Sequence, residues 1–136
     1  MFSIIVASHG TFSKGLVETS ALFLGDSAYE SVRYFGLEIE DEVKDFGESL
    51  FNGIEEEIKK GNEVLVITDM KSGSPFNQTL IASEKYEFKH LTGINLPTYL
   101  EILCNRQFMS LNEIMNEIIE KASVSIEDVS DILKDI

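Results

Sequence analysis

The chain has 136 residues, of which 24 are acidic and 11 are basic, so its formal net charge is −13. This balance argues against a nucleic-acid partner, because phosphate backbones are bound by basic surfaces. The single cysteine, Cys104, excludes an intrachain disulfide and favours a cytoplasmic protein. A chain of this length can bury an ordinary hydrophobic core, so we expect residues 1–136 to form one domain. The opening apolar run, residues 1–7, is too short to span a membrane and lacks the basic flank of a signal peptide.

Strand patterns alternate with helix patterns along the chain. Short apolar runs rich in β-branched residues predict strands, and apolar residues spaced three and four apart predict helices. In chain order the predicted elements are a strand at 2–8, a helix at 16–24, a strand at 32–35, a helix at 41–59, a strand at 64–68, a helix at 75–85, a strand at 88–94, and helices at 98–106 and 111–122. Gly61 is a candidate left-handed helix cap, and Ser110 with Glu113 matches a capping box. Residues 123–136 are weakly periodic and fit a final helix, a fraying tail or a strand lent to a partner.

This order of elements predicts an α/β fold, with a three-layer, doubly wound, mostly parallel sheet of about four strands and helices on both faces. Sheets of this kind bind ligands at the carboxyl ends of their strands. Polar loops that contain glycine follow three of the predicted strands, at residues 8–13, 69–77 and 93–97. Most of the negative charge lies elsewhere, in residues 38–63 and 111–136, which we interpret as solvated helix faces.

Two of these loops carry a candidate reactive pair. His9 and Asp69 each follow a predicted strand, so a carboxylate reaches the imidazole if the two strands are neighbours. The carboxylate would then fix the tautomer of the ring and leave the other nitrogen free to attack. Ser72, Gly73 and Ser74 open the next helix, where backbone N–H groups and hydroxyls can hold a phosphate-sized anion without a metal. Each residue taken alone also fits an ordinary turn or cap, and their coincidence at one sheet edge favours function.

Several other chemistries lack their motifs. The chain has no Walker-type loop, no G-x-G-x-x-G after the first strand and no G-x-S-x-G elbow. Its two histidines and one cysteine are far apart in sequence, so we expect neither a metal nor a cofactor. We interpret His90 as a surface histidine and Cys104 as a small core residue on an apolar helix face. Phe12 and Phe76 fit either an exposed docking surface or packing under the loops.

Three segments resemble the mannose-type enzyme IIA (EIIA) component of the bacterial phosphoenolpyruvate-dependent sugar phosphotransferase system. They are residues 4–16 (IIVASHGTFSKGL), 66–77 (VITDMKSGSPFN) and 93–101 (GINLPTYLE), in the order and at the separations typical of that family. The likeness covers nearly the whole chain. One departure is the run from Met70 to Gly73, where many relatives have two small residues before the Ser-Pro pair. We hypothesise that Lys71, on the rim of the pocket, helps to select the protein partner.

The resemblance implies a phosphohistidine carrier. His9 would accept a phosphoryl group from the phosphocarrier protein HPr and pass it to a IIB component, which phosphorylates sugar entering through membrane IIC and IID components. The phosphate would sit on Nε2 of His9 while Asp69 holds Nδ1, in a pocket lined by Gly73 and Ser74 with Gly10 and Thr11 close by. The resemblance also implies a homodimer with an exchanged C-terminal strand, and a cytoplasmic protein peripheral to the membrane transport complex.

Two alternative functions stay open. The phosphoryl-donor subunit of the phosphotransfer-dependent dihydroxyacetone kinase shares the fold and the N-terminal histidine, although segments 74–77 and 95–97 favour sugar transport. A regulatory module that binds a small anion without transferring it is the second alternative. The presence of both His9 and Asp69 argues against that module.

Overall fold

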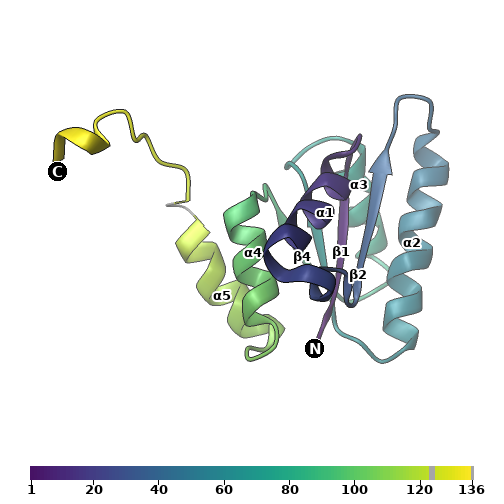
Figure 1. The fold of residues 1–136 in the computed structure, drawn as a ribbon. Helices are drawn as coiled ribbons and strands as arrows, with labels where there is room; N and C mark the ends of the chain where they lie inside the picture. Colours follow the sequence, from purple (N-terminus) through teal and green to yellow (C-terminus); the bar gives the residue numbers. More distant parts are fainter. Residues whose placement is uncertain (123–124, 136) are drawn as a thin grey trace.

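Four parallel strands form one sheet in the order β2-β1-β3-β4 in the computed structural model, which describes residues 1–122 and 125–135 (Figure 1). The strands are β1 Ser3–His9, β2 Val32–Leu37, β3 Val64–Thr68 and β4 Lys89–Thr92. The central strands β1 and β3 are nearly continuous apolar runs, as is typical of strands covered on both faces. The α/β fold with a parallel sheet that the sequence predicts is confirmed.

Five α-helices cover the two faces of this sheet within the described residues. They are α1 Phe12–Leu24, α2 Val43–Lys59, α3 Ser74–Ala82, α4 Leu96–Asn105 and α5 Leu111–Ala122, and a short 3₁₀ helix, η1 Gly25–Tyr29, follows α1. Helices α1, α4 and α5 pack on one face, and α2 and α3 pack on the other (Figure 1). Side chains alternate along β1 accordingly, because Ile4 and Val6 join the first core while Ile5 and Ala7 join the second.

Two predicted helix ends have the expected geometry. Gly61 has φ +86° and ends α2 in the left-handed region that favours glycine. The Ser110 hydroxyl accepts the Glu113 N–H at 3.2 Å, and the Glu113 carboxylate accepts the Ser110 N–H at 3.4 Å. These two bonds form the capping box at the start of α5. Local sequence signals therefore position the ends of α2 and α5.

The start of α1 differs from the prediction. The helix begins at Phe12, one turn before the first apolar residue of the periodic pattern, Leu16. The reason is a buried serine, Ser8, whose hydroxyl accepts the backbone N–H of Ser13 at 2.7 Å and so satisfies a donor in the first turn. The helix consequently starts close to the end of β1, where His9 lies.

Residues 125–135 lead away from the sheet and end in the 3₁₀ helix η2 Ile132–Asp135 (Figure 1). The described residues of this segment form no strand. The rest of the weakly periodic stretch, residues 123–124 and 136, lies outside the described residues. Exchange of a C-terminal strand between subunits therefore stays a prediction.

A buried carboxylate, Glu57 of α2, ties the amino ends of β1 and β2 together. It accepts hydrogen bonds from the Ser3 hydroxyl at 2.6 Å, from Arg33 Nη2 at 2.9 Å and from Lys60 Nζ at 3.2 Å. Burial alone would raise the pKa of the Glu57 carboxyl, but the hydrogen bonds from Ser3, Lys60 and Arg33 outweigh it and lower the pKa to about 2. This cluster lies at the opposite end of β1 from His9, so it can be tested without disturbing the sheet edge.

We expect Glu57 to make the stability of the fold sensitive to acid. Its pKa is lower in the folded chain than the ordinary value of 4.5. Its stabilisation is therefore complete above pH 4.5 or so and is lost as the pH falls toward 2, amounting to about 2–3 kcal/mol. In urea titrations, Glu57→Gln will have a lower free energy of unfolding than the wild type at pH 7, and the difference will shrink toward pH 2.

The matched control is Glu56→Gln. Glu56 also pairs with Arg33, through Nη1 at 2.7 Å, but its side chain is 58% exposed. Exposed ion pairs contribute little, so this variant will stay within about 1 kcal/mol of the wild type. A Glu57→Gln difference that is the same at pH 7 and pH 2 would show that the carboxylate charge is not the cause.

Candidate functional site

The strand order creates a topological switch point at the carboxyl ends of β1 and β3. From β1 the chain leaves through α1 on one face, whereas from β3 it leaves through α3 on the opposite face. Such a switch point between neighbouring parallel strands is where open α/β sheets bind ligands. Ala7 of β1 pairs with Thr68 of β3, so the residues that follow, including His9 and Asp69, meet at this edge.

The Asp69 carboxylate holds His9 in one orientation. Its Oδ2 accepts hydrogen bonds from His9 Nδ1 at 2.8 Å and from the His9 backbone N–H at 3.0 Å, and its Oδ1 accepts the Met70 N–H at 3.0 Å. An ionised carboxylate has only acceptors, so the His9 proton lies on Nδ1 and Nε2 keeps a free lone pair. The side chain of His9 is 45% exposed and that of Asp69 is 14% exposed. The edge thus carries an oriented and accessible imidazole.

Gly73 lies against the Nε2 side of the same ring. This residue precedes α3 with φ +85°, and a Cβ atom built on it would lie 2.7 Å from both Cε1 and Nε2 of His9. The helix α3 therefore begins directly beside the free nitrogen. The first backbone N–H groups of a helix have no partner inside that helix. Pro75 has no N–H group, so the available donors are those of Ser74 and Phe76. Together with the helix dipole they favour an anion next to Nε2.

The other predicted pocket residues lie at the same edge with different roles. Gly10 has φ +54°, and its N–H donates to the Leu37 carbonyl at 2.8 Å, so it turns the chain between β1 and α1 and has no N–H to offer a ligand. Thr11 and Ser72 are exposed, and Thr11 makes no capping bond to α1. Sequence reasoning missed Gly36, where a Cβ atom would lie 2.2 Å from the Gly10 carbonyl oxygen. Gly36 lies one residue beyond the strand predicted at 32–35 but inside β2, where a glycine often marks such a close backbone approach.

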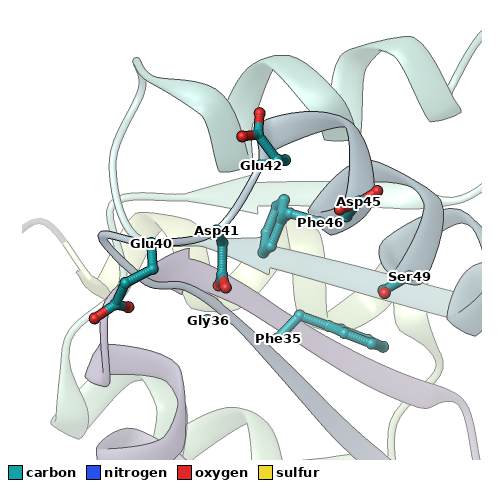
Figure 2. Close-up of a pocket in the computed structure, with 8 residues that line it drawn as sticks. All are labelled: Phe35, Gly36, Glu40, Asp41, Glu42, Asp45, Phe46 and Ser49. Atoms are coloured by element: carbon teal, nitrogen blue, oxygen red, sulfur yellow. The ribbon is translucent and has the colours of Figure 1, made fainter.

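A separate pocket of about 330 Å³ lies beyond the end of β2. Figure 2 shows acidic side chains of the loop after β2 and of the start of α2 around two phenylalanine rings. The acidic residues are Glu40, Asp41, Glu42 and Asp45. Their negative charge disfavours an anionic ligand in this pocket. The start of α3 beside His9 is therefore the better place for a phosphate-sized anion.

Two interpretations from the sequence are wrong. His90 is half-buried and not a surface residue, because its register opposite Val66 turns its side chain toward α3. Cys104 is exposed and not in the core. The buried side of α4 is formed by Ile102 and Leu103, and Cys104 is rotated away from it.

The structure also shows where the candidate docking residues Phe12 and Phe76 and the rim residue Lys71 lie. Phe12 is 44% exposed at the start of α1. Phe76 is partly buried and packs on the ring of His90 with a centroid separation of 5.2 Å. Lys71 is exposed in the loop between Asp69 and α3. Of these three residues, Phe12 and Lys71 offer exposed side chains to a docking protein at this edge.

The described residues offer neither a cluster of metal ligands nor a helix that could span a membrane. Residues 1–122 and 125–135 contain no group of three or more histidine, cysteine or acidic side chains placed to hold a metal ion. In the same part of the chain, none of the helices has the length and apolar character needed to cross a membrane.

The comparisons with known proteins identify the family. The family model described as EIIA-man, PTS system fructose IIA component, matches residues 3–119. The chain belongs to this family. It is 27% identical over 137 residues to the PTS system fructose-specific EIIA component of Bacillus subtilis (strain 168), and the match covers 98% of this chain and 90% of that protein.

Two crystal structures are similar to this EIIA along nearly their whole length. The phosphotransferase system component EIIA from Streptococcus agalactiae is 27% identical, with a TM-score of 0.82 over 96% of this chain and 98% of that one. The PTS IIA protein associated with the fucose utilization operon from Streptococcus pneumoniae is 31% identical, with a TM-score of 0.82 over 98% and 99% of the two chains. This EIIA is thus a component of a sugar phosphotransferase system with a phosphoryl-carrier role.

Proposed function

We propose that this EIIA carries the phosphoryl group on Nε2 of His9, accepting it from phospho-HPr and passing it to a IIB component. The observation that supports the proposal is the arrangement of one ring. Asp69 holds Nδ1 at 2.8 Å, and Gly73 brings the start of α3 against Nε2. Residues 1–136 would act as a single EIIA domain in this transfer.

The transfer needs little proton movement at His9. The lone pair of Nε2 attacks phosphorus, the N–P bond forms and the bond to the donor breaks, while the proton on Nδ1 stays in place. The phosphorylated ring is a cation, which the Asp69 carboxylate stabilises through the Nδ1–H bond. The phosphoryl group brings about −1.5 to −2 charges, and the N–H groups at Ser74 and Phe76 can balance them. Attack by a nucleophile of IIB on phosphorus reverses the sequence and restores the free ring.

The direct test is the intact mass of the full chain after incubation with enzyme I, HPr and phosphoenolpyruvate. We expect a gain of one phosphoryl group, about 80 Da, with ³¹P and ¹⁵N NMR signals of an Nε2-phosphorylated histidine. Added IIB should remove the group. No gain in mass would overturn the proposal. A phosphorylated chain that discharges to an ADP-loaded dihydroxyacetone kinase and not to IIB would establish the donor-subunit alternative instead.

Asp69→Asn should slow phosphorylation by HPr about 10–100-fold, a loss of the size found when the hydrogen-bond partner that orients a metal-binding histidine is removed. The carboxylate accepts three N–H groups at once, and the amide offers a single oxygen in its place. The variant also loses the charge that stabilises the phosphorylated ring. Stopped-flow or quench-flow measurement of the transfer rate from phospho-HPr checks the expectation.

Asp41→Asn is the matched control for that experiment. Asp41 is also a carboxylate near the carboxyl edge of the sheet, and its Oδ2 accepts the Glu38 N–H at 2.8 Å. The change removes one negative charge without touching His9, so we expect a transfer rate within about twofold of the wild type. Equal losses in the two variants would show that net charge, and not orientation of the ring, causes the effect.

The dimer implied by the family resemblance is part of the same proposal. Ser125 Oγ accepts a hydrogen bond from Asn95 Nδ2 at 2.6 Å, which ties the C-terminal segment to the loop after β4. Beyond this tie the segment exposes Ile126 and Leu133 almost fully. A second copy of the chain would cover these apolar side chains. Sedimentation of the full chain and of a chain ending at residue 125 should give a dimer and a monomer, respectively.

A further inference from the structure

His90 lies beneath the site and contacts the end of β3. Its Nε2 is 2.8 Å from the hydroxyl oxygen of Thr68, the residue directly before Asp69. The Thr68 side chain is fully buried, and its hydroxyl donates to that of Thr92 at 2.8 Å. Because Thr68 uses its only hydrogen toward Thr92, it accepts from His90, so the His90 proton lies on Nε2. A line of side chains therefore runs from β4 to the residue that precedes Asp69.

The same imidazole also supports the start of α3. The ring of Phe76, the third residue of that helix, packs on His90 with a centroid separation of 5.2 Å and an interplanar angle of 42°. Burial lowers the pKa of His90, which keeps the ring neutral at pH 7. His90 therefore touches both elements that form the site, the end of β3 with Asp69 and the helix that begins after Gly73.

We propose that His90 is a positioning residue for phosphoryl transfer: its N–H bond to Thr68, held in place by packing against Phe76, fixes the end of β3 so that Asp69 keeps His9 aligned with the start of α3. The proposal rests on the transfer function proposed for His9. Sites of this kind need their groups held within about 0.5 Å, and a shift of about 1 Å can lower a rate a hundredfold. A partner one residue from Asp69 is close enough to cause a shift of that size.

Three variants separate the effect of the hydrogen bond between His90 and Thr68 from the effect of packing between His90 and Phe76. His90→Phe keeps an aromatic ring against Phe76 but removes the donor to Thr68. His90→Gln restores an N–H donor without a ring. Leu91→Val is the matched control, because Leu91 is the next residue on β4 and packs against the opposite core. The readouts are the saturated transfer rate and KM for phospho-HPr, the ¹⁵N shifts of the His9 ring, and the midpoint of thermal unfolding.

We expect His90→Phe to lower the saturated rate about tenfold, as a displacement of the reacting groups by less than about 1 Å would do. KM for phospho-HPr should stay within twofold, since the docking surface is untouched, and the His9 ring signals should move. His90→Gln should recover more than half of the lost rate, and Leu91→Val should transfer like the wild type even if its thermal midpoint falls.

Two results would overturn the proposal: a His90→Phe rate and His9 ¹⁵N shifts equal to those of the wild type, or a His90→Gln rate as low as that of His90→Phe. If the phenylalanine variant does not fold, the rate of His90→Gln relative to the wild type still decides, because a loss of tenfold with the donor present contradicts the proposed role. A wild-type chain that accepts no phosphoryl group would instead defeat the proposed function, and the His9 ring shifts would still test the positioning.

Discussion

A His9→Ala chain incubated with enzyme I, HPr and phosphoenolpyruvate will keep its unmodified mass, whereas the wild type gains one phosphoryl group, about 80 Da. The chain has only two histidines, so a phosphohistidine must form on His9 or on His90. We expect His90 to be a poor substitute, because its Nε2 is bonded to Thr68 and its ring is half-buried and packed on Phe76. His9 presents a free Nε2 at an accessible edge. The expected loss is complete, and intact mass spectrometry measures it directly.

The control for this experiment is His90→Gln, which removes the other histidine. It should still gain one phosphoryl group at full extent, although more slowly than the wild type. Circular dichroism of both variants checks that the fold persists, which we expect for His9→Ala because the His9 side chain is 45% exposed. A mass gain in His9→Ala would mean that the phosphoryl group is carried by another residue.

The pairing of His9 with Asp69 could be predicted from the sequence only if the two strands that precede them are neighbours in the sheet. Each residue follows a short apolar strand, and the carboxyl ends of parallel strands share one edge. Whether the two strands are neighbours depends on the side to which each helical crossover turns, and periodicity carries no information on this. The order β2-β1-β3-β4 supplies the missing step. The start of α3 beside His9 could be predicted as an anion site, but its contact with Nε2 through Gly73 could not.

Positions within the elements were harder to predict than the elements themselves. The charged residues Glu87 and Lys89 just before His90 indicate solvent. Alternate residues of a strand face opposite ways, however, and the register with Val66 decides which way His90 faces. Cys104 follows Leu103 on an apolar stretch, but one step along a helix rotates a side chain by about 100°, which takes it out of the buried stripe. Both errors concern which side of a strand or helix is covered by another element. The local sequence alone does not contain this information.

Gly73→Ala is expected to lower the phosphorylation rate at least a hundredfold, a loss consistent with misplacing the reacting groups by about 1 Å. The added Cβ would lie 2.7 Å from Nε2 and Cε1 of His9, where no carbon atom fits. Either the imidazole must turn away from Asp69 or the start of α3 must withdraw from Nε2. Both movements separate the nucleophile from the groups that would hold the phosphoryl oxygens. Quench-flow transfer from phospho-HPr measures the rate, and ¹⁵N shifts of the His9 ring report which movement occurs.

The same substitution also strains the backbone, because Gly73 has φ +85°, and Gly61→Ala separates this effect from the clash. Gly61 has φ +86°, but a Cβ atom there meets nothing within 4 Å, and the residue follows α2, in the loop leading into β3. Both variants should lose about 1–3 kcal/mol of stability because the backbone conformation favours glycine, and Gly73→Ala should lose the more, because its ψ of 179° places it in a region nearly exclusive to glycine. Only Gly73→Ala should lose transfer. Similar transfer rates in the two variants would mean that a glycine is needed at position 73 for the backbone conformation of the turn, and not for the space beside Nε2 of His9.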